Sequence, residues 1–517
     1  MNKIRVLWID DEVENLKPHF LFLNNRGYQT TGATNGQDAL DFIQRIDFDV
    51  ILLDENMPGL SGIETLQSIK TKKPQLPVIM ITKNEEEKIM EDAIGAKISD
   101  YLIKPVNPNQ ILLSLKKIFK HKDLIAEKTI ENYQKEFGKL AQEVHSLQSY
   151  QDWINHFEKL VYWELELESL EDPSMFEIFE SQKIESNSLF GKFIERNYLD
   201  WIDSNNGPIL SNDLFAKLVI PKLKEFKPTI LLLIDNLRLD QWHIIREELN
   251  NTHSIESELK YFSILPTTTQ YARNAIFAGL KPIDIQKKFP HWWKFDHEEG
   301  GKNLFEEDLL KEQFKRLGKD IAFSFHKITQ LVQSQQLLKN LQNCLRDNLT
   351  VIVYNFVDMI SHAKTEMEII KELAPDNKAY RSLTLSWFRN SPLKKILNKS
   401  AELGFQLLLT TDHGTINVKK PSPVIGDKET SLNLRYKAGR SITYDSKDVL
   451  DLKDPNLLGL PSISLNSQYI FANQYNYFVY KNNFNHYASL FKNTFQHGGV
   501  SLEEMIIPFI QLNPKAK

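Results

Sequence analysis

Short hydrophobic runs alternate with amphipathic stretches between Ile4 and about Lys120. The runs read IRVLWID, YQTTGAT, DVILLDE, PVIMIT and DYLIKP. This regular alternation of strand-like and helix-like segments predicts five βα units. Because most of the runs are hydrophobic on both faces, we expect a parallel sheet covered by helices on both sides. The expected fold is flavodoxin-like, with strand order 2-1-3-4-5.

The pattern changes twice further along the chain. From about Asp123 to Asn206 the strand pattern is absent, and large side chains recur at helical spacing, which predicts an α-helical bundle with a hydrophobic core. These side chains are Trp153, Phe157, Leu160 and Trp163. After the turn-forming SNNGP at 204–208, strands and helices alternate again in TILLLID, YFSILP, TVIVYNFVD, FQLLLTTDH and MIIPFIQL. We therefore expect an α/β multidomain protein with parts at 1–122, 123–210 and 211–517.

The composition restricts the chemistry that such a chain can carry. With 517 residues, 41% of them hydrophobic, the chain is too long for one core. The single Cys344 excludes an intramolecular disulfide and a thiolate zinc site, and suits a reducing cytoplasm. A net charge of −5 does not favour binding to duplex DNA. We see no signal core and no apolar run of about 18 residues, so we expect neither export nor a membrane span, and a cytoplasmic location.

Acidic residues end two strands that the expected order makes neighbours. Asp10 and Asp11 follow the first strand and Asp54 ends the third, so the three carboxylates should converge at one sheet edge. Such close carboxylates repel one another unless a hard cation, most simply Mg²⁺, lies among them. Thr82 and Lys104 end the fourth and fifth strands at the same edge. Together these groups could stabilise a phosphoryl group on Asp54.

These residues resemble the receiver domain of response regulators over roughly residues 3–120. The resemblance is carried by Asp10-Asp11, LLDENMPG around Asp54, Ile81-Thr82 and DYLIKP with Lys104. It implies phosphorylation of Asp54 by a sensor histidine kinase. It also implies that Thr82 and Tyr101 are switch side chains, and that the fourth and fifth helical units form a dimer face.

A second set of metal-ligand types follows the strands of the C-terminal part. Asp235, Asp358 and the pair Asp412-His413 each follow a hydrophobic run, His362 lies four residues after Asp358, and His497 precedes two glycines. Spacing of four places a carboxylate and an imidazole on one helical face. Three Asp and three His suit two zinc-like ions about 3.5–4 Å apart that clamp a phosphoryl group.

Such a site also needs a nucleophile. LPTTTQYARNAIFAG offers three consecutive threonines, and a metal-bound hydroxyl becomes a nucleophilic alkoxide. A basic stretch could neutralise substrate phosphate or could equally be a solvated face; it comprises Arg435, Lys437 and Arg440. Arg273 and Asn274 are weaker candidates for the same task. We interpret His291 and His297 as structural.

The order Asp, Thr, Asp-x-x-x-His, Asp-His, His resembles the alkaline phosphatase superfamily over about 216–512. LLLIDNLRLDQW, the threonine segment and HGGVSLEEMIIPFI look most like its PglZ branch. The resemblance implies one zinc ion held by Asp358, His362 and His497, and another held by Asp235, Asp412 and His413. It implies Thr269 as the bridging nucleophile, because the family's nucleophile lies three residues after a proline and ten before a glycine, as Pro266 and Gly279 allow. Thr268 remains the alternative.

The three parts together resemble PorX-type response regulators, a family associated with the type IX secretion system. This resemblance implies cytoplasmic signalling, a cognate sensor kinase, zinc, and cleavage of phosphodiesters such as short or cyclic oligonucleotides. We predict that phosphorylation of Asp54 promotes a homodimer and that the helical bundle transmits this change to the C-terminal clefts. The alternative is a phosphorylation-gated, non-catalytic binding module for a sigma factor or a secretion component.

Overall fold

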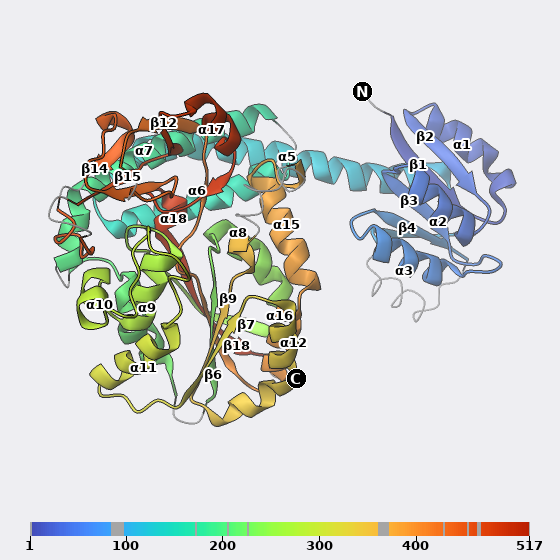
Figure 1. Ribbon diagram of the computed structural model, residues 1–517. Coiled ribbons are helices and arrows are strands. Elements are labelled where there is room, and N and C mark those ends of the chain that lie inside the picture. The colour runs from blue at the N-terminus through green and yellow to red at the C-terminus, as the bar shows by residue number, and fades with distance from the viewer. Residues whose placement is uncertain are drawn as a thin grey trace. The chain divides into compact units, whose positions relative to one another are not determined.

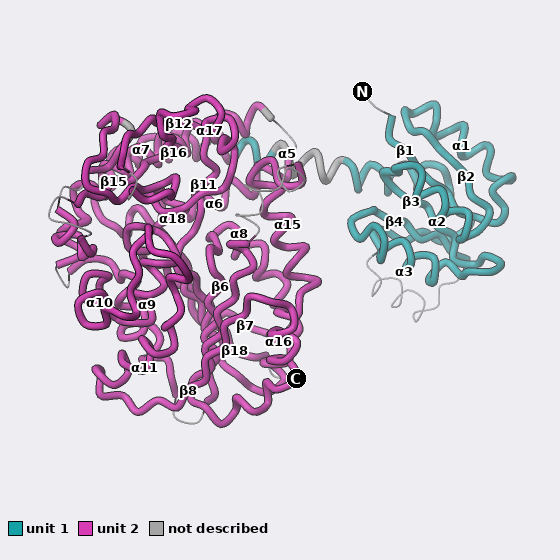
Figure 2. The backbone as a smooth tube through the Cα atoms, in the orientation of Figure 1, with its two compact units in different colours: residues 1–132 teal, residues 133–517 magenta. Residues whose placement is uncertain are grey.

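The computed structural model describes most of the chain as two compact units. The described residues are 3–83, 98–170, 173–203, 206–224, 227–359, 372–427, 430–451, 454–462 and 467–515, without the side chains of 120–127, 173 and 448. The units comprise residues 1–132 and 133–517 (Figure 2). None of the helices described in either unit is long and hydrophobic enough to cross a lipid bilayer.

The first unit is a five-stranded parallel sheet with helices on both faces (Figure 1). Its strands are β1 (Ile4–Ile9), β2 (Tyr28–Ala33), β3 (Val50–Asp54), β4 (Val78–Thr82) and β5 (Asp100–Ile103). The described helices are α1 (Lys17–Asn24), α2 (Gly36–Arg45), α3 (Gly62–Lys72) and the start of α5 (Pro108–Glu143). The order β2-β1-β3-β4-β5, with every neighbouring pair parallel, confirms the flavodoxin-like prediction.

The chain around β3 is held by caps and by one close backbone contact. Ser61 and Glu64 form a capping box that starts α3, which satisfies amides that the first helical turn leaves unpaired. A Cβ atom on Gly62 would lie 2.5 Å from the Asp54 carbonyl oxygen, so only glycine allows this approach. The turn after β3 therefore packs tightly against the end of the strand, and this packing fixes the position of the Asp54 backbone.

Three long helices follow the receiver-like sheet. They are α5, α6 (Tyr150–Glu168) and α7 (Pro173–Asp203), and α5 spans the boundary between the two units. The aromatic stripe of α6 is buried as expected: Trp153 packs on Phe190 with ring centroids 5.3 Å apart, and Trp163 packs on Tyr133 at the same separation. These side chains share one continuous core with the large sheet of the second unit. The helical segment is thus part of the body that carries the second set of ligand residues.

The large sheet of the second unit has the order β7-β18-β10-β6-β9-β8. Its strands are β6 (Thr229–Ile234), β7 (His253–Phe262), β8 (Phe323–Ile328), β9 (Leu349–Tyr354), β10 (Gln406–Thr410) and β18 (Ile506–Pro514). Strands β10, β6, β9 and β8 are parallel, whereas β18 runs antiparallel to both of its neighbours. The carboxyl ends of β6, β9 and β10 therefore open onto the same edge.

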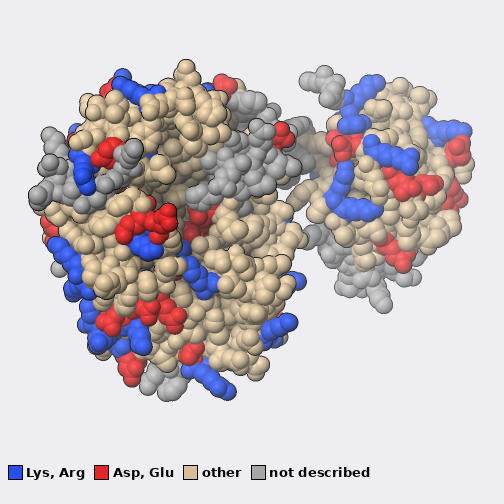
Figure 3. Space-filling model, viewed as in Figure 1, with Lys and Arg blue, Asp and Glu red and all other residues tan. Residues whose placement is uncertain are grey.

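Helices and small sheets complete the second unit. The helices are α8 (Leu239–Ile245), α9 (Asn274–Ala278), α10 (Pro282–Lys288), α11 (Glu306–Arg316), α12 (Leu331–Asn340), α15 (Asn377–Asn390), α16 (Pro392–Glu402), α17 (Phe484–Phe491) and α18 (Leu502–Met505). The small sheets pair β11 (Ile416–Asn417) with β17 (Phe495–Gln496), β12 (Lys420–Val424) with β16 (Asn476–Tyr480), and β13 (Tyr436–Gly439) with β15 (Gln468–Ala472) and β14 (Val449–Asp451). On the face drawn in Figure 3, basic and acidic side chains are interspersed, in keeping with the modest net charge.

Candidate functional site

The first unit gathers an acidic cluster at the carboxyl edge of its sheet. Ligand oxygens of Asp10, Asp11 and Asp54 all lie within 4.8 Å of one another. Asp10 and Asp54 are buried, whereas Asp11 is exposed. Lys104 Nζ lies 2.9 Å from Asp10 Oδ2 and 2.9 Å from Asp54 Oδ2, so one ammonium group offsets both buried charges. Three carboxylates around one point form a donor set that suits Mg²⁺.

Electrostatics around Asp54 oppose its ionised form. Burial raises the pKa of the Asp54 carboxyl, the adjacent Lys104 lowers it, and the charges of Asp10 and Asp11 raise it further. Asp54 Oδ1 is buried and accepts no hydrogen bond from any residue described. An oxygen in this state favours a cation or a phosphoryl group beside it.

The two predicted switch residues lie on β4 and β5. Thr82 is fully buried and its hydroxyl donates to Glu55 Oε2 at 2.6 Å, which ties β4 to the residue after the phosphoacceptor. Tyr101 is half-buried and packs against the hydrophobic cluster on one face of the sheet. The Thr82 hydroxyl therefore contacts the neighbour of Asp54 in this state.

The second unit gathers Asp235, Asp412 and His413 at the carboxyl ends of β6 and β10. Their ligand atoms lie within 4.8 Å of one another, and all three residues are buried. His413 Nε2 lies 3.7 Å from Asp235 Oδ1 and 3.8 Å from Asp412 Oδ2. Burial raises the pKa of Asp412 well above its ordinary value, and the charge of Asp235 raises it further. Asp412 Oδ2 accepts no hydrogen bond from the described part of the chain, as expected of an oxygen meant for a cation.

Backbone carbonyls orient the two histidines of this site. His413 Nδ1 donates to the Gly414 carbonyl at 3.1 Å, and His497 Nδ1 donates to the Thr267 carbonyl at 3.3 Å. Each ring is thereby held as the tautomer whose Nε2 lone pair is available to a metal. The two rings are stacked, with centroids 4.3 Å apart. Burial lowers the pKa of His413 well below its ordinary value, and the neighbouring His497 lowers it further, so this imidazole is neutral.

A second pair of ligand candidates adjoins the first cluster. His497 Nε2 lies 3.5 Å from Asp358 Oδ1. The side chain of Asn236 donates to the same Asp358 oxygen at 3.3 Å, while its backbone amide donates to Asp412 Oδ1 at 3.3 Å. Asn236 has a positive φ of 63°, a conformation that asparagine tolerates better than most residues. The turn after β6 therefore links the two carboxylates, a role that sequence reasoning missed although Asn after Asp235 was its signal.

The structure brings five of the six predicted ligands together. Asp235, Asp412 and His413 form one group, and Asp358 and His497 form the adjoining pair. The rings of His413 and His497 join the two groups. His362, the sixth predicted ligand, lies outside the described residues.

Thr269 opens a π-helical turn over Thr269–Arg273 and faces the first group of ligands. Its Oγ1 lies 3.2 Å from both Asp235 Oδ1 and His413 Nε2. Asn303 donates to the Thr269 carbonyl at 3.0 Å and so fixes the backbone beneath the hydroxyl. The Thr268 hydroxyl is buried and has no hydrogen-bond partner in the described chain. Among the described residues, no ligand oxygen or nitrogen lies within hydrogen-bonding reach of that hydroxyl, so the geometry favours Thr269.

Arg273 supplies the positive charge beside this cluster. Its Nη1 lies 2.6 Å from Asp235 Oδ2 and 3.9 Å from Asp412 Oδ2, and its Nε lies 2.6 Å from Glu306 Oε1. The same Nη1 donates to Asn355 Oδ1 at 3.3 Å. Arg273 therefore holds ligand carboxylates in place, a contact that the sequence marked only weakly.

The other basic candidates have different surroundings. Arg435 is fully buried, and its Nη2 lies 2.6 Å from Glu504 Oε2, so its guanidinium is engaged inside the fold. Lys437 is buried and donates to the Ser431 carbonyl at 2.9 Å, and burial lowers its pKa to about 7. Arg440 is exposed.

The sequence also singled out Asn274, His291 and His297. Asn274 is buried and donates to the Lys302 carbonyl at 3.0 Å, whereas His291 and His297 are exposed.

Comparisons with known protein families cover nearly the whole chain. Residues 6–116 match the response regulator receiver domain, residues 123–202 match the PorX response regulator linker domain, and residues 214–512 match the BREX system PglZ alkaline phosphatase-like domain. The three matched segments follow one another in the order predicted from the sequence.

Curated relatives match about a quarter of the chain. The transcriptional regulatory protein ZraR of Klebsiella oxytoca is 31% identical over 136 residues, which cover 26% of this chain and 31% of ZraR. ResD of Bacillus subtilis is 33% identical over 119 residues, which cover 23% of this chain and 49% of ResD. The chain thus spans about a third to a half of the length of these relatives.

Solved structures match a similar share of the chain. Chemotaxis protein CheY4 of Vibrio cholerae is 27% identical, with a TM-score of 0.22, and the match covers 22% of this chain and 98% of CheY4. TrrA of Thermotoga maritima, solved in complex with Mg(2+)-BeF, is 29% identical with a TM-score of 0.21, over 22% of this chain and 97% of TrrA. The receiver assignment rests on the family match and the observed strand order.

Proposed function

Since the chain belongs to the PglZ alkaline phosphatase-like family and has the domain order of a PorX-type response regulator, we propose that it is a two-component regulator with a phosphodiesterase effector. Phosphorylation of Asp54 controls the effector. The observation that carries this proposal is the Thr269 hydroxyl, 3.2 Å from both Asp235 Oδ1 and His413 Nε2. A hydroxyl beside a carboxylate and a neutral imidazole suits a phosphoryl-transfer nucleophile.

The donor set fits two zinc ions. One group comprises Asp235, Asp412 and His413, and the adjoining pair comprises Asp358 and His497. The family resemblance implies His362 as a further ligand. Buried carboxylates and imidazoles with available Nε2 atoms are the ligands that zinc takes where thiolate is absent. When bound, zinc neutralises the carboxylates and favours the alkoxide form of the threonine hydroxyl.

The residues of the chain then perform a two-step transfer. The Thr269 oxygen bonds to phosphorus while one ester oxygen leaves as an alcohol, and water later cleaves the phosphothreonine to release a phosphate monoester. Arg273 keeps Asp235 in place through its 2.6 Å contact, and Asn303 keeps the Thr269 backbone in place. Both residues lower the reorganisation needed during the reaction.

Phosphodiesters such as short or cyclic oligonucleotides are the substrate class that we propose. We further propose a cytoplasmic protein that acts in control of type IX secretion, as the family resemblance implies. We propose that a sensor histidine kinase phosphorylates the receiver in the cytoplasm, a compartment that the one cysteine of the chain suits.

Control begins at the receiver. Asp10, Asp11 and Asp54 would hold Mg²⁺, and Lys104 would follow the phosphoryl group once it is attached to Asp54. Thr82 and Tyr101 would then change their contacts and expose a face on which two receivers pair.

Buried charges give the helical segment a route to the effector site. Lys183 on α7 is 2% exposed, and its Nζ lies 2.6 Å from Glu164 on α6 and 3.1 Å from Glu503 on α18. A Cβ atom on Gly414 would lie 1.9 Å from the Glu503 carbonyl oxygen, so α18 packs directly on the turn that holds His413. A displacement of α6 and α7 would therefore reach a metal ligand through two contacts.

Thr269→Val tests the nucleophile. The variant keeps the shape of threonine but lacks the hydroxyl, so we expect it to retain the metal content and melting temperature of the wild type and to lose phosphodiesterase turnover by at least about 100-fold. Turnover is measured with a chromogenic phosphodiester and metal content by elemental analysis. Wild-type protein that is metal-loaded and inactive would instead favour the non-catalytic module that binds a sigma factor or a secretion component.

Asp54→Ala tests the coupling. We expect acetyl phosphate to convert wild type to dimer, as measured by light scattering, and to change its turnover, while the variant stays monomeric with unchanged zinc content. Thr82→Ser, which keeps the hydroxyl, is the control. Equal dimerisation of Asp54→Ala and wild type would contradict the coupling.

A further inference from the structure

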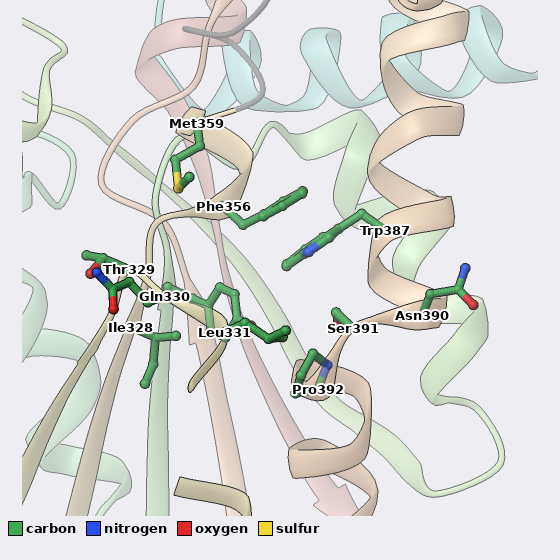
Figure 4. Close-up of a pocket in the computed structure, with 11 residues that line it drawn as sticks. Ile328, Thr329, Gln330, Leu331, Phe356, Met359, Trp387, Asn390, Ser391 and Pro392 are labelled. Carbon is green, nitrogen blue, oxygen red and sulfur yellow. The ribbon is translucent and has the colours of Figure 1, made fainter. Parts of the chain in front are cut away.

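We propose that a groove lined by residues on either side of Asp358 in the sequence seats one nucleobase of the substrate by stacking on Phe356 and Trp387. This inference rests on the proposed phosphodiesterase function and adds a base subsite to it. The groove has a volume of about 350 Å³ and lies between the ends of β8, β9 and α15 (Figure 4). Its apolar lining comprises Ile328, Leu331, Tyr354, Phe356, Met359 and Trp387.

The aromatic pair in the groove has the geometry of a stacking platform. The rings of Phe356 and Trp387 are 4.1 Å apart and tilted by only 6°. Tyr354 contacts the indole of Trp387 from another side, with centroids 5.6 Å apart. Both Phe356 and Trp387 remain partly exposed, so an added planar group can extend the stack. Stacking on protein rings strengthens binding by about 5- to 150-fold per base.

One ring of the platform, Phe356, lies on the same stretch of chain as the candidate metal ligand Asp358. Residues 355–359 follow β9, whose carboxyl end shares an edge with those of β6 and β10. Asn355 accepts from Arg273 and Asp358 lies 3.5 Å from His497, while Phe356 and Met359 line the groove. One five-residue segment therefore carries both a ligand of the reacting centre and the wall of the groove.

Exposed apolar side chains around the groove favour the binding of a ligand there. Leu331 is 60% exposed and Met359 is 51% exposed, next to the aromatic pair. Apolar area that gathers around a concavity is a common mark of a ligand site. The sulfur of Met359 also suits the edge of an aromatic ring.

The polar groups at the rim predict weak discrimination between bases. The Thr329 hydroxyl donates to Gln333 Oε1 at 3.2 Å, and the Asn390 side chain donates to the Ser386 carbonyl at 2.8 Å. Because these groups already have partners within the protein, stacking should dominate over hydrogen-bond recognition. We therefore expect purines to bind better than pyrimidines, and adenine and guanine to bind similarly.

The first experiment measures binding without turnover. Zinc-loaded Thr269→Val protein is titrated with a dinucleotide that carries 2-aminopurine, whose fluorescence falls when the base stacks. We expect quenching, and a Kd about 10-fold higher when Trp387→Leu is added. Leu331→Gln alters an exposed wall residue with little risk to folding, and we expect it to raise Kd about threefold. Tyr487→Leu removes an exposed stacked ring on α17 and should leave Kd unchanged.

The second experiment measures turnover with a matched substrate lacking a base. We expect Trp387→Leu to raise KM for a purine dinucleotide about 10-fold and to leave turnover of the abasic dinucleotide unchanged. An unchanged KM, or an equal loss on both substrates, would overturn the base subsite while leaving the phosphodiesterase intact. If wild type cleaves neither substrate, the proposed function fails, and the 2-aminopurine titration alone decides whether the groove stacks a base.

Discussion

The receiver site and the effector site both place acidic residues at the carboxyl edge of parallel strands, but they balance the charge differently. In the receiver, Lys104 contacts both Asp10 and Asp54, and its side chain is 17% exposed. In the effector, Arg273 is 2% exposed and is fixed by both Asp235 and Glu306. A flexible ammonium group can follow an arriving phosphoryl group, whereas a buried guanidinium with two anionic partners cannot move.

The candidate metal ligands of the two sites also differ in how firmly they are held. The receiver offers three carboxylates, one of them on the exposed Asp11, which suits Mg²⁺ that exchanges with solvent. The effector adds His413 and His497, whose Nδ1 atoms are tied to backbone carbonyls. Preorganised imidazoles bind a resident metal. We infer that the receiver site suits a transient charge and that the effector site suits a resident metal ion.

The largest effect that separates the two sites should come from deleting one ligand in each. We expect His413→Ala to lose at least about 100-fold in zinc affinity and in phosphodiesterase turnover, because even outer partners of a ligand contribute 10–100-fold. We expect Asp10→Ala to abolish Mg²⁺-dependent phosphorylation by acetyl phosphate. Elemental analysis and a phosphoprotein gel measure the two outcomes.

The crossed measurements serve as controls for this pair. His413→Ala should still be phosphorylated at Asp54, and Asp10→Ala should keep its zinc. A loss of zinc in Asp10→Ala would mean that the receiver carboxylates also affect zinc binding in the effector. The two sites would then not bind their metals independently.

The next expected effect concerns the two cationic side chains, Arg273 in the effector and Lys104 in the receiver. We expect Arg273→Met to lower the unfolding free energy of the metal-free effector by about 3–5 kcal/mol, because it leaves Asp235 buried without a cationic partner and Glu306 with Lys327 alone. Lys104→Met should cost the receiver about 1–3 kcal/mol, and Mg²⁺ should restore it. Peptide-resolved hydrogen exchange measures both. Equal losses in the two units, both restored by metal, would remove the distinction between a fixed and a mobile cation.

The ligand sets could be predicted from the sequence because each member follows a hydrophobic strand. The ends of β1 and β3 carry Asp10 and Asp54, and the ends of β6 and β10 carry Asp235 and Asp412. Strand ends that share a sheet edge bring such residues together whatever their separation in the chain. The strand order of the receiver could also be predicted, because hydrophobic runs mark its strands.

Partners inside the fold could not be predicted in this way. Arg435 looked like a phosphate contact because its neighbours in the sequence are also basic, yet Glu504 and backbone carbonyls surround its guanidinium. Asn303 and Glu306, which hold Thr269 and Arg273, lie on a segment without a motif. Periodicity reports which face of an element is apolar, but it does not report which polar group from a distant segment meets a buried charge.

The smallest expected effect is a loss of unfolding free energy in acid, which we expect in the second unit. Burial lowers the pKa of His156 and of His253, both in the second unit, from 6.5 to about 4. Both side chains are neutral in the folded state at pH 5, but they bind protons when the chain unfolds. The stability that this neutral burial contributes is complete above pH 6.5 and is lost as pH falls toward 4. At pH 5 we expect a loss of about 1–2 kcal/mol for each histidine.

Denaturation followed by tryptophan fluorescence measures this loss in the second unit, because every tryptophan except Trp8 lies within residues 133–517. His156→Gln should weaken the dependence of the unfolding free energy on pH between 6.5 and 4, since glutamine does not titrate. His145→Gln, at an exposed position, is the matched control and should leave that dependence as it is in wild type. If His156→Gln and wild type lose the same stability between pH 7 and pH 5, the acid response arises elsewhere in the unit, and neutral burial of His156 does not distinguish the effector from the receiver.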